Sequence, residues 1–303
     1  MAGNKVFVTG ATGRLGRAVM AMLPDAIPLV REPGGLKDEV VTDFSTDQLK
    51  IILIGAKVVV HLAGSVDTTD KKALHDSNVS LTWRLVDALP KGCRIVFASS
   101  VSVYGKKLAS MPANEGTEAH PDSDYARSKY QAEKIVEKWP DHVILRVSTI
   151  YGPQFDDYAK VIDMIRKGRM RSIGKGTNRI PFVHVDDVAA AVVAAVGRGK
   201  GTYVIAGEPL AQKDIYRIAA QDLGVEPPKK SVQLPLAMFM AVAGEAIYKL
   251  TKKGKPVLTA EHVSILGYDR VFDCSRARSD LGFSPRPLAD GIRAMVAVLA
   301  KAK

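Results

Sequence analysis

The sequence predicts an α/β fold, a doubly wound parallel sheet flanked by helices, followed by a smaller C-terminal region. Short β-rich runs alternate with longer helical patterns through the first half of the chain, and a glycine-rich turn follows the first run. The composition is that of a folded protein, since 47% of the 303 residues are hydrophobic and 25% are charged.

The alternating elements follow one another in a regular order. The β-rich runs are Lys5–Thr9, Ile27–Val30, Val58–Leu62, Arg94–Ala98 and Val143–Val147. Between them, apolar residues recur at helical spacing over Leu15–Leu23, Thr46–Ile54, Lys72–Leu89 and Asp124–Trp139. A parallel sheet built in this way is Rossmann-like.

The rhythm breaks after Tyr151-Gly152-Pro153, where a second, smaller region begins with the helical pattern Phe155–Lys167. The helical pattern Val185–Val196 and the β-rich run Gly201–Ala206 then return to the sheet. We therefore expect interleaved domains: residues 1–150 plus about 180–206 form the sheet domain, and about 151–179 plus 207–303 form the smaller region.

The glycine turn between the first strand and the first helix has the features of a phosphate-binding site. Gly10 and Gly13 let the backbone approach a pyrophosphate closely, and Gly16 permits tight packing of the helix on the strand. The glycines are spaced by three, which differs from the commoner G-x-G-x-x-G pattern. The turn residues expected to contact a dinucleotide are Gly10, Thr12, Gly13, Arg14 and Leu15.

The end of the second β run tests which dinucleotide binds. Arg31 favours the 2′-phosphate of NADP, whereas Glu32, which follows it, suits the ribose hydroxyls of NAD. NADP is the preferred prediction and NAD the alternative. Asp43, with Phe44 beside it, follows the short β run Val40-Val41, and we expect both at the adenine end of the cofactor. Asp43 is equally suited to the start of the next helix.

Two polar groups point to proton-transfer chemistry. Tyr125 and Lys129 are four residues apart, which places them on one face of a helix. A lysine cation close by, in a site shared with a positively charged nicotinamide, favours the phenolate of a tyrosine, which can then exchange a proton with a carbinol. Ser99 and Ser100 end the fourth β run, at the sheet edge where ligands of such folds bind.

Several motifs occur in the order found in one family. They are Thr9-Gly10-x-x-Gly13-x-x-Gly16, His61-Leu62-Ala63-Gly64, Ser99-Ser100-x-x-Val103-Tyr104-Gly105, Tyr125-x-x-x-Lys129 and Leu145-Arg146-x-x-x-x-Tyr151-Gly152-Pro153. The chain thus resembles the extended short-chain dehydrogenase/reductase, or NAD-dependent epimerase/dehydratase, family over roughly its first 190 residues. Within that family it looks like the branch of dihydroflavonol reductases and 3β-hydroxysteroid dehydrogenase-like proteins.

The resemblance implies a role for each matching residue. Ser100 hydrogen-bonds the reacting oxygen, with Ser99 as the neighbouring candidate; Tyr125 is the acid/base and Lys129 also binds the nicotinamide ribose. Leu62, Ala63 and Gly64 line the cofactor cleft, Arg146 is structural, and the segment around His184 packs the interface of the two regions. Gly64 stands where many relatives carry alanine.

The predicted function is an NAD(P)-dependent oxidoreductase that interconverts a carbonyl and a secondary alcohol on a fairly apolar small molecule. The alternative is a nucleotide-sugar epimerase or dehydratase that works through a transient keto intermediate. A third hypothesis is a dinucleotide-sensing or assembly protein without turnover. The residues quoted above favour an enzyme.

The remaining expectations concern partners and location. The net charge of +11 is scattered, so no nucleic-acid partner is predicted, and the two cysteines suggest neither disulfides nor a metal site. The chain is expected to be cytoplasmic, without stable membrane insertion, and a homodimer through 72–89 and 124–139. The apolar run Leu234–Ala243 is expected in the core, with a pocket wall or a membrane contact as alternatives.

Overall fold

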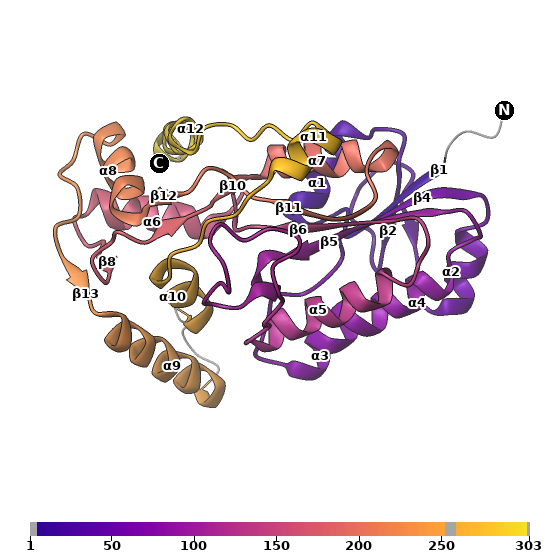
Figure 1. The fold of residues 1–303 in the computed structure, drawn as a ribbon, viewed down its shortest axis with the longest axis horizontal. Helices are drawn as coiled ribbons and strands as arrows, with labels where there is room; N and C mark the ends of the chain where they lie inside the picture. The colour runs from indigo at the N-terminus through magenta and orange to yellow at the C-terminus, as the bar shows by residue number, and fades with distance from the viewer. Residues whose placement is uncertain (1–4, 252–258, 302–303) are drawn as a thin grey trace.

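The structure is a computed structural model that describes residues 5–251 and 259–301. Its centre is a seven-stranded parallel sheet in the order β11-β6-β5-β4-β1-β2-β3 (Figure 1). The strands are β1 (Lys5–Thr9), β2 (Ile27–Val30), β3 (Val40–Val41), β4 (Ala56–His61), β5 (Arg94–Ser100), β6 (His142–Val147) and β11 (Gly201–Ile205). The predicted fold class is confirmed.

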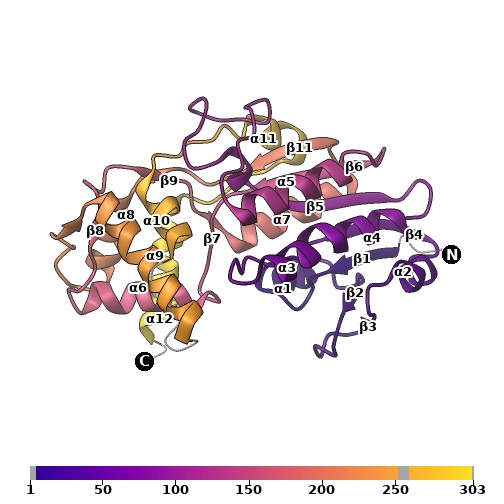
Figure 2. The same ribbon diagram turned by 90° about the horizontal axis from the view of Figure 1, so that it is seen from below.

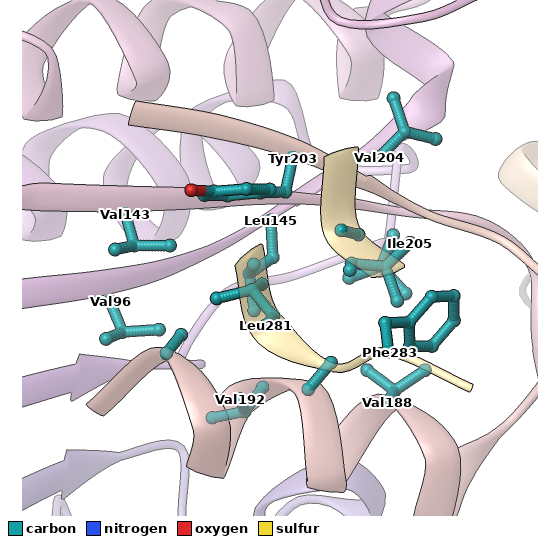
Figure 3. Close-up of a cluster of buried hydrophobic side chains, with 14 of the residues drawn as sticks. Val96, Val143, Leu145, Val188, Val192, Tyr203, Val204, Ile205, Leu281 and Phe283 are labelled. Carbon is teal, nitrogen blue, oxygen red and sulfur yellow. The ribbon is translucent and has the colours of Figure 1, made fainter. Parts of the chain in front are cut away.

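Helices cover both faces of this sheet, because its strands carry apolar residues on both sides. One face is covered by α1 (Arg14–Met22), α7 (Val185–Gly197) and the late helix α11 (Ser275–Leu281). Figure 3 shows Val188 and Val192 of α7 near Leu281 and Phe283 in this buried layer. The other face packs against α2 (Thr46–Ile52), α4 (Leu81–Asp87) and α5 (Asp124–Val136).

The segment predicted as one helix over 72–89 contains an irregular turn. It consists of α3 (Lys71–His75), the π-helical turn η1 (Asp76–Ser80) and α4. The turn buries Asn78, which is a polar residue that hydrophobic periodicity alone does not place in the interior. π-helical turns of this kind are frequent at functional sites.

The smaller region lies beyond the carboxyl ends of the sheet strands (Figure 2). Its helices are α6 (Asp156–Arg166), α8 (Gln212–Asp222), α9 (Leu234–Thr251), α10 (Ala260–Gly267) and α12 (Leu288–Lys301). Three two-stranded sheets accompany them, formed by β7 (Ile150–Tyr151) with β10 (Val183–His184), β9 (Arg179–Ile180) with β12 (Leu210–Ala211), and β8 (Ser172–Ile173) with β13 (Ser231–Val232). A separate apolar cluster joins α6, α8 and α12.

The apolar run Leu234–Ala243 begins α9, and only one side of it is buried. Ala237 and Ala241 lie in a small apolar cluster with α10, whereas Leu236, Phe239 and Met240 are exposed. Leu234 and Met238 also pack against that cluster, so the expectation that this run lies in the core is wrong for Leu236, Phe239 and Met240. In the described part of the chain, no helix is long and apolar enough to cross a membrane.

Candidate active site

The glycine turn after β1 is closely packed and leaves the start of α1 open. Gly10 has a φ of +71°, and a Cβ atom there would lie 2.6 Å from the backbone nitrogen of Ala63. A Cβ at Gly16 would lie 2.0 Å from the carbonyl oxygen of Gly10. Among the described residues, no side chain caps the first turn of α1, which begins after Gly13 and contains no acidic residue. These amides and the positive end of the helix fit a pyrophosphate.

The other predicted residues of the turn lie at its surface. Thr12 and Arg14 are exposed, and Leu15 is half-buried. The guanidinium of Arg14 lies 4.9 Å from the ring centroid of Phe155, at the entrance to the smaller region. A cavity of about 460 Å³ beside the turn is lined by Thr12, Arg14 and Gln154. The glycine turn thus lies between the cleft expected to hold the dinucleotide and the smaller region.

Arg31 and Phe44 are neighbours at the ends of β2 and β3. Arg31 is exposed, with its guanidinium carbon 6.0 Å from the Phe44 ring centroid. The carboxylate of Glu39 accepts hydrogen bonds from the backbone N–H groups of residues 34–36, so that acid is engaged within its own loop. Glu32 is exposed. The surface near Arg31 therefore fits a phosphate, with Glu32 as the competing acid.

Asp43 is engaged at the start of α2. Its Oδ1 accepts a hydrogen bond from the backbone N–H of Ser45 at 2.7 Å, and this bond lowers the pKa of the Asp43 carboxyl. Ser45 itself caps the helix. The structure thus shows the local role considered for Asp43, and its contact with adenine stays a prediction.

A buried histidine at the end of β4 is hydrogen-bonded to the end of β1. One ring nitrogen of His61 lies 2.7 Å from the hydroxyl of Thr9, and the other lies 2.9 Å from the hydroxyl of Thr82 in α4. Burial, followed by the charge of Lys129, lowers the pKa of His61 to about 3, so the ring is neutral. Leu62 and Ala63, which follow it, donate backbone hydrogen bonds to Thr9. His61 is therefore a structural support of the cleft.

Asn78 is a site residue that the sequence analysis missed. Its Oδ1 accepts a hydrogen bond from the backbone of Ser65, and its Nδ2 donates to the Ser65 carbonyl and to the hydroxyl of Ser128. A Cβ at Gly64 would lie 2.8 Å from this Oδ1 and 3.9 Å from the Lys129 ammonium. Asn78 thus fixes the loop after β4 beside Lys129 and accounts for glycine at position 64.

Ser100 and Tyr125 come together at the carboxyl end of β5. The Ser100 hydroxyl accepts a backbone hydrogen bond from Ser102 at 3.1 Å, and it lies near the phenol of Tyr125, whose pKa it lowers. Tyr125 lies in the first turn of α5, which Ser123 caps. The phenol therefore faces the cleft next to the serine.

Tyr125 is protonated in the protein chain alone. Burial raises the pKa of Tyr125 to about 12; the hydrogen bond from Ser100 opposes this rise, and the charge of Glu261 adds to it. The phenolate expected beside both Lys129 and a positively charged nicotinamide stays a prediction. In the protein chain by itself, the Lys129 ammonium donates to the Ala98 carbonyl at 2.6 Å, and burial dominates the titration of the phenol.

Lys129 lies one helical turn after Tyr125 and is buried. Its ammonium is 4.3 Å from the ring centroid of Phe97, in addition to its bond to Ala98. Burial lowers the pKa of Lys129 to about 8, while the charge of Glu133 opposes this change. The ammonium thus lies at the carboxyl end of β5, one helical turn from Tyr125, where it can also donate to a hydroxyl.

Ser99 points away from the cleft into a buried ion pair. Its hydroxyl donates to Glu133, whose carboxylate also accepts hydrogen bonds from Arg146 at 2.8 to 3.3 Å. Arg146 donates in addition to the hydroxyl of Tyr104. The Ser99 side chain and Arg146 therefore hold β5, β6 and α5 in register, which agrees with the structural role expected of Arg146.

The smaller region contributes charged groups to the same cleft. Glu261, at the start of α10, is largely buried, and burial raises its pKa while Arg270 opposes that shift. Arg270 donates to the carbonyls of Val101 and Gly105, next to Ser100. The sequence spacing did not indicate that Glu261 and Arg270 lie near Ser100, because Glu261 is 161 positions further along the chain.

His184 caps a helix at the junction of the two regions. Its Nδ1 accepts a hydrogen bond from the backbone of Asp186, at the start of α7, and its ring packs edge-on against Tyr151. Arg286 forms ion pairs with Asp186 and Asp187 there. This segment joins the regions, as the resemblance implied.

A cavity of about 660 Å³ opens in the smaller region. Its wall is mainly apolar and aromatic and includes Tyr158, Phe182, Ile215 and Met240. Phe155, which also lines it, contacts Arg14 of the glycine turn, so the cavity adjoins the dinucleotide cleft. Its volume lies within the range of small-molecule sites, roughly 300–1,000 Å³.

These features define a dinucleotide-dependent enzyme of the extended short-chain dehydrogenase/reductase class. They are the order of strands in the sheet, the glycine turn after β1, and the group formed by Ser100, Tyr125 and Lys129. The chain belongs to the NAD dependent epimerase/dehydratase family, whose sequence pattern matches residues 6–206. The resemblance drawn from the motifs is confirmed. The substrate and the choice between NADP and NAD are not fixed by membership of this family.

Individual relatives differ in their reactions. The chain is 29% identical over 272 residues to 3beta-hydroxysteroid-dehydrogenase/decarboxylase isoform 1 of Arabidopsis thaliana, covering 79% of this chain and 61% of that protein, so it spans about three-fifths of that relative. It is 24% identical over 325 residues to the 2-alkyl-3-oxoalkanoate reductase of Stenotrophomonas maltophilia, covering 97% and 98%. Among solved structures, gox2253 superposes with a TM-score of 0.78 at 28% identity, covering 99% and 98%.

Proposed function

We propose that this protein is an NADP-dependent reductase that converts a ketone on a largely apolar molecule to a secondary alcohol. The observation that carries the proposal is the protonated phenol of Tyr125 next to Ser100, together with an apolar cavity that adjoins the glycine turn. A phenol that keeps its proton at neutral pH is suited to donate it, which is the demand of carbonyl reduction.

The chain's own residues supply orientation and the proton. Ser100 donates a hydrogen bond to the carbonyl oxygen, and Tyr125 transfers its proton to that oxygen as the carbonyl carbon is reduced. The Lys129 ammonium, held by the Ala98 carbonyl, stabilises the charge left on the phenol and can bind the cofactor ribose. A reduced nicotinamide supplies the hydride when bound.

The apolar cavity supports the substrate class. Two relatives are named for substrates rich in hydrocarbon, a 3β-hydroxysteroid and a 2-alkyl-3-oxoalkanoate. The cavity wall includes Tyr158, Phe182 and Ile215, which favour a ring system or alkyl chain. The substrate's apolar part would occupy this cavity while its ketone lies at Ser100 and Tyr125.

The test is reduction of a panel that contains a 2-alkyl-3-oxo acid, a 3-oxosteroid and UDP-glucose, with nicotinamide absorbance and product identity followed together. We expect the apolar ketones to consume NADPH. Tyr125→Phe should lower kcat at least about 100-fold, while Tyr130→Phe, on the same helix, should not. Interconversion of the nucleotide sugar without net change in absorbance would reject the reductase in favour of an epimerase.

The choice of NADP rests on Arg31 and has its own test. A charged hydrogen bond to a 2′-phosphate is typically worth about 1.5–3 kcal/mol, so direct titration should show NADPH binding at least about tenfold more tightly than NADH. Arg31→Ala should reduce the difference between the affinities for NADPH and NADH, without weakening the binding of NADH. Tighter binding of NADH by the wild type would reject this assignment.

A further inference from the structure

Helix α9 packs two alanines fully against the protein, with Leu234 and Met238 beside them, and turns most of its large apolar residues toward solvent. Ala237 and Ala241 are 2% and 1% exposed, whereas Phe239 is 71% and Leu250 is 85% exposed. A surface helix of a globular protein normally buries its large apolar side chains and exposes polar ones. The exposed side of α9 is therefore suited to contact with an apolar surface that is not part of this chain.

The large exposed side chains of α9 form one continuous strip. Residues three, four or seven positions apart lie on the same side of a helix, and these intervals connect the members of the set. We call this strip the α9 outer face; it consists of Leu236, Phe239, Met240, Val242, Ile247 and Leu250. Figure 1 shows α9 at the edge of the smaller region, beside α10. Apolar patches of this kind mark contact surfaces.

The chain around the α9 outer face is basic. Residues 226–261 contain six lysines and three glutamates, a net charge of +3 out of +11 for the whole chain. Lys229 and Lys230 are exposed just before the helix, and Lys229 forms an ion pair with Glu226 at 2.9 Å. Arg171 is exposed beside them, because the backbone of Ser172 donates a hydrogen bond to the Lys230 carbonyl. Cations next to an apolar strip match the interface of an anionic bilayer.

The charge also argues against a second copy of this chain as the occupant. A two-fold contact through α9 would bring the exposed Lys230 and Arg171 of each copy toward those of the other, where like charges repel. An anionic lipid surface instead gains from these cations. The α9 outer face also lies over the wall of the large cavity, since Met240 both lines the cavity and is exposed.

We propose that the α9 outer face, together with the lysines that precede it, docks this protein on the surface of an anionic lipid bilayer. The helix lies parallel to the membrane plane, with its apolar strip at the boundary between headgroups and acyl chains. This contact is peripheral and does not depend on the proposed reaction, so either proposal can fail while the other stands.

The test is co-sedimentation of the full chain with vesicles of phosphatidylcholine alone and of phosphatidylcholine mixed with phosphatidylglycerol. We expect strong binding to the mixed vesicles, weaker binding to phosphatidylcholine, and a loss of the difference at high salt. Lys229→Gln with Lys230→Gln should lower binding to the mixed vesicles several-fold, since each cation near such a surface contributes about a fivefold gain.

The apolar part of the contact is tested by Phe239→Glu combined with Leu250→Glu. This variant should bind the mixed vesicles at least about tenfold more weakly than the wild type, because two charges enter the acyl boundary. Ile51→Glu is the matched control, because Ile51 is a similarly exposed apolar residue on α2. Thermal melting and dinucleotide binding establish that each variant is folded.

Three results would overturn the proposal. One is a wild-type chain that stays in the supernatant with both kinds of vesicle. Another is equal binding by the wild type and the Phe239→Glu, Leu250→Glu variant. The third is a wild-type dimer that this variant converts to monomers in sedimentation velocity, with no uptake by vesicles, which would make the face a self-association surface.

Discussion

The buried ion pair of Glu133 and Arg146 makes the strongest prediction about stability. Glu133 is 0% and Arg146 is 6% exposed, and the two share three hydrogen bonds. Burial opposes the charge of Arg146, but the hydrogen bonds and charge of Glu133 outweigh it and raise the pKa of Arg146. Glu133→Gln removes the compensating charge and leaves the guanidinium buried, which typically costs about 3–5 kcal/mol.

Urea unfolding followed by tryptophan fluorescence measures this loss. Trp139 lies just after the helix that carries Glu133, and its indole N–H donates to the carbonyl of Cys93, so its emission should report on this part of the fold. Glu137→Gln is the matched control on the same helix, where a partly exposed pair with Lys134 is worth about 1 kcal/mol or less.

The same pair allows a rescue experiment. Glu133→Leu combined with Arg146→Met replaces both charges by apolar groups, and such replacements are often neutral or stabilising. The double variant should therefore be more stable than Glu133→Gln. A loss below about 1 kcal/mol in Glu133→Gln, or a double variant less stable than the single one, would refute the reasoning that the uncompensated charge dominates.

Three further predictions follow from the site and its surroundings. Gly64→Ala should lower the free energy of unfolding by about 1–3 kcal/mol, because the new methyl group meets the buried Asn78 amide; Gly197→Ala, where a Cβ meets nothing within 4 Å, is its control in urea titrations. The folded pKa of Lys129, about 8, lies below its usual 10.5, so the unfolded chain binds more protons between these values. Stability should therefore rise with pH through that window, by up to about 3 kcal/mol from this group, and a Lys129→Met variant without this rise would support the assignment. The predicted dimer through 72–89 and 124–139 should dissociate in Trp83→Lys when sedimentation velocity is measured, since Trp83 is a large exposed residue of α4.

Local sequence patterns predicted the sheet well. The limits of β1 and β2 agree with the predicted runs, and the other predicted strands differ by at most two residues at either end. Hydrophobic strand periodicity and glycine chemistry are short-range properties, so they survive without knowledge of the fold. The π-helical turn at Asn78 was missed because it depends on hydrogen bonds to Ser65 and Ser128, 13 and 50 residues away.

Side-chain partners at the site were less predictable than the positions of the elements. The sequence placed Ser99 and Ser100 equally at the sheet edge, but strand alternation sends them to opposite sides. Ser99 meets Glu133, whereas Ser100 meets Tyr125. The protonation state of Tyr125 in the protein chain by itself is set mainly by burial, which depends on residues from the whole chain and so is not given by the local sequence.

The late helix α11 has a consequence for biosynthesis. Every strand of the large sheet is complete once Ile205 has been synthesised, yet Leu281 and Phe283 are part of the cluster that encloses Val188 and Val192 on α7. A nascent or prematurely terminated polypeptide that stops before residue 275 therefore carries a whole sheet on which this apolar face is covered by α1 and α7 alone. Such fragments are expected clients of chaperones and proteases, and productive folding waits until the last tenth or so of the chain, from residue 275 onward, has been synthesised.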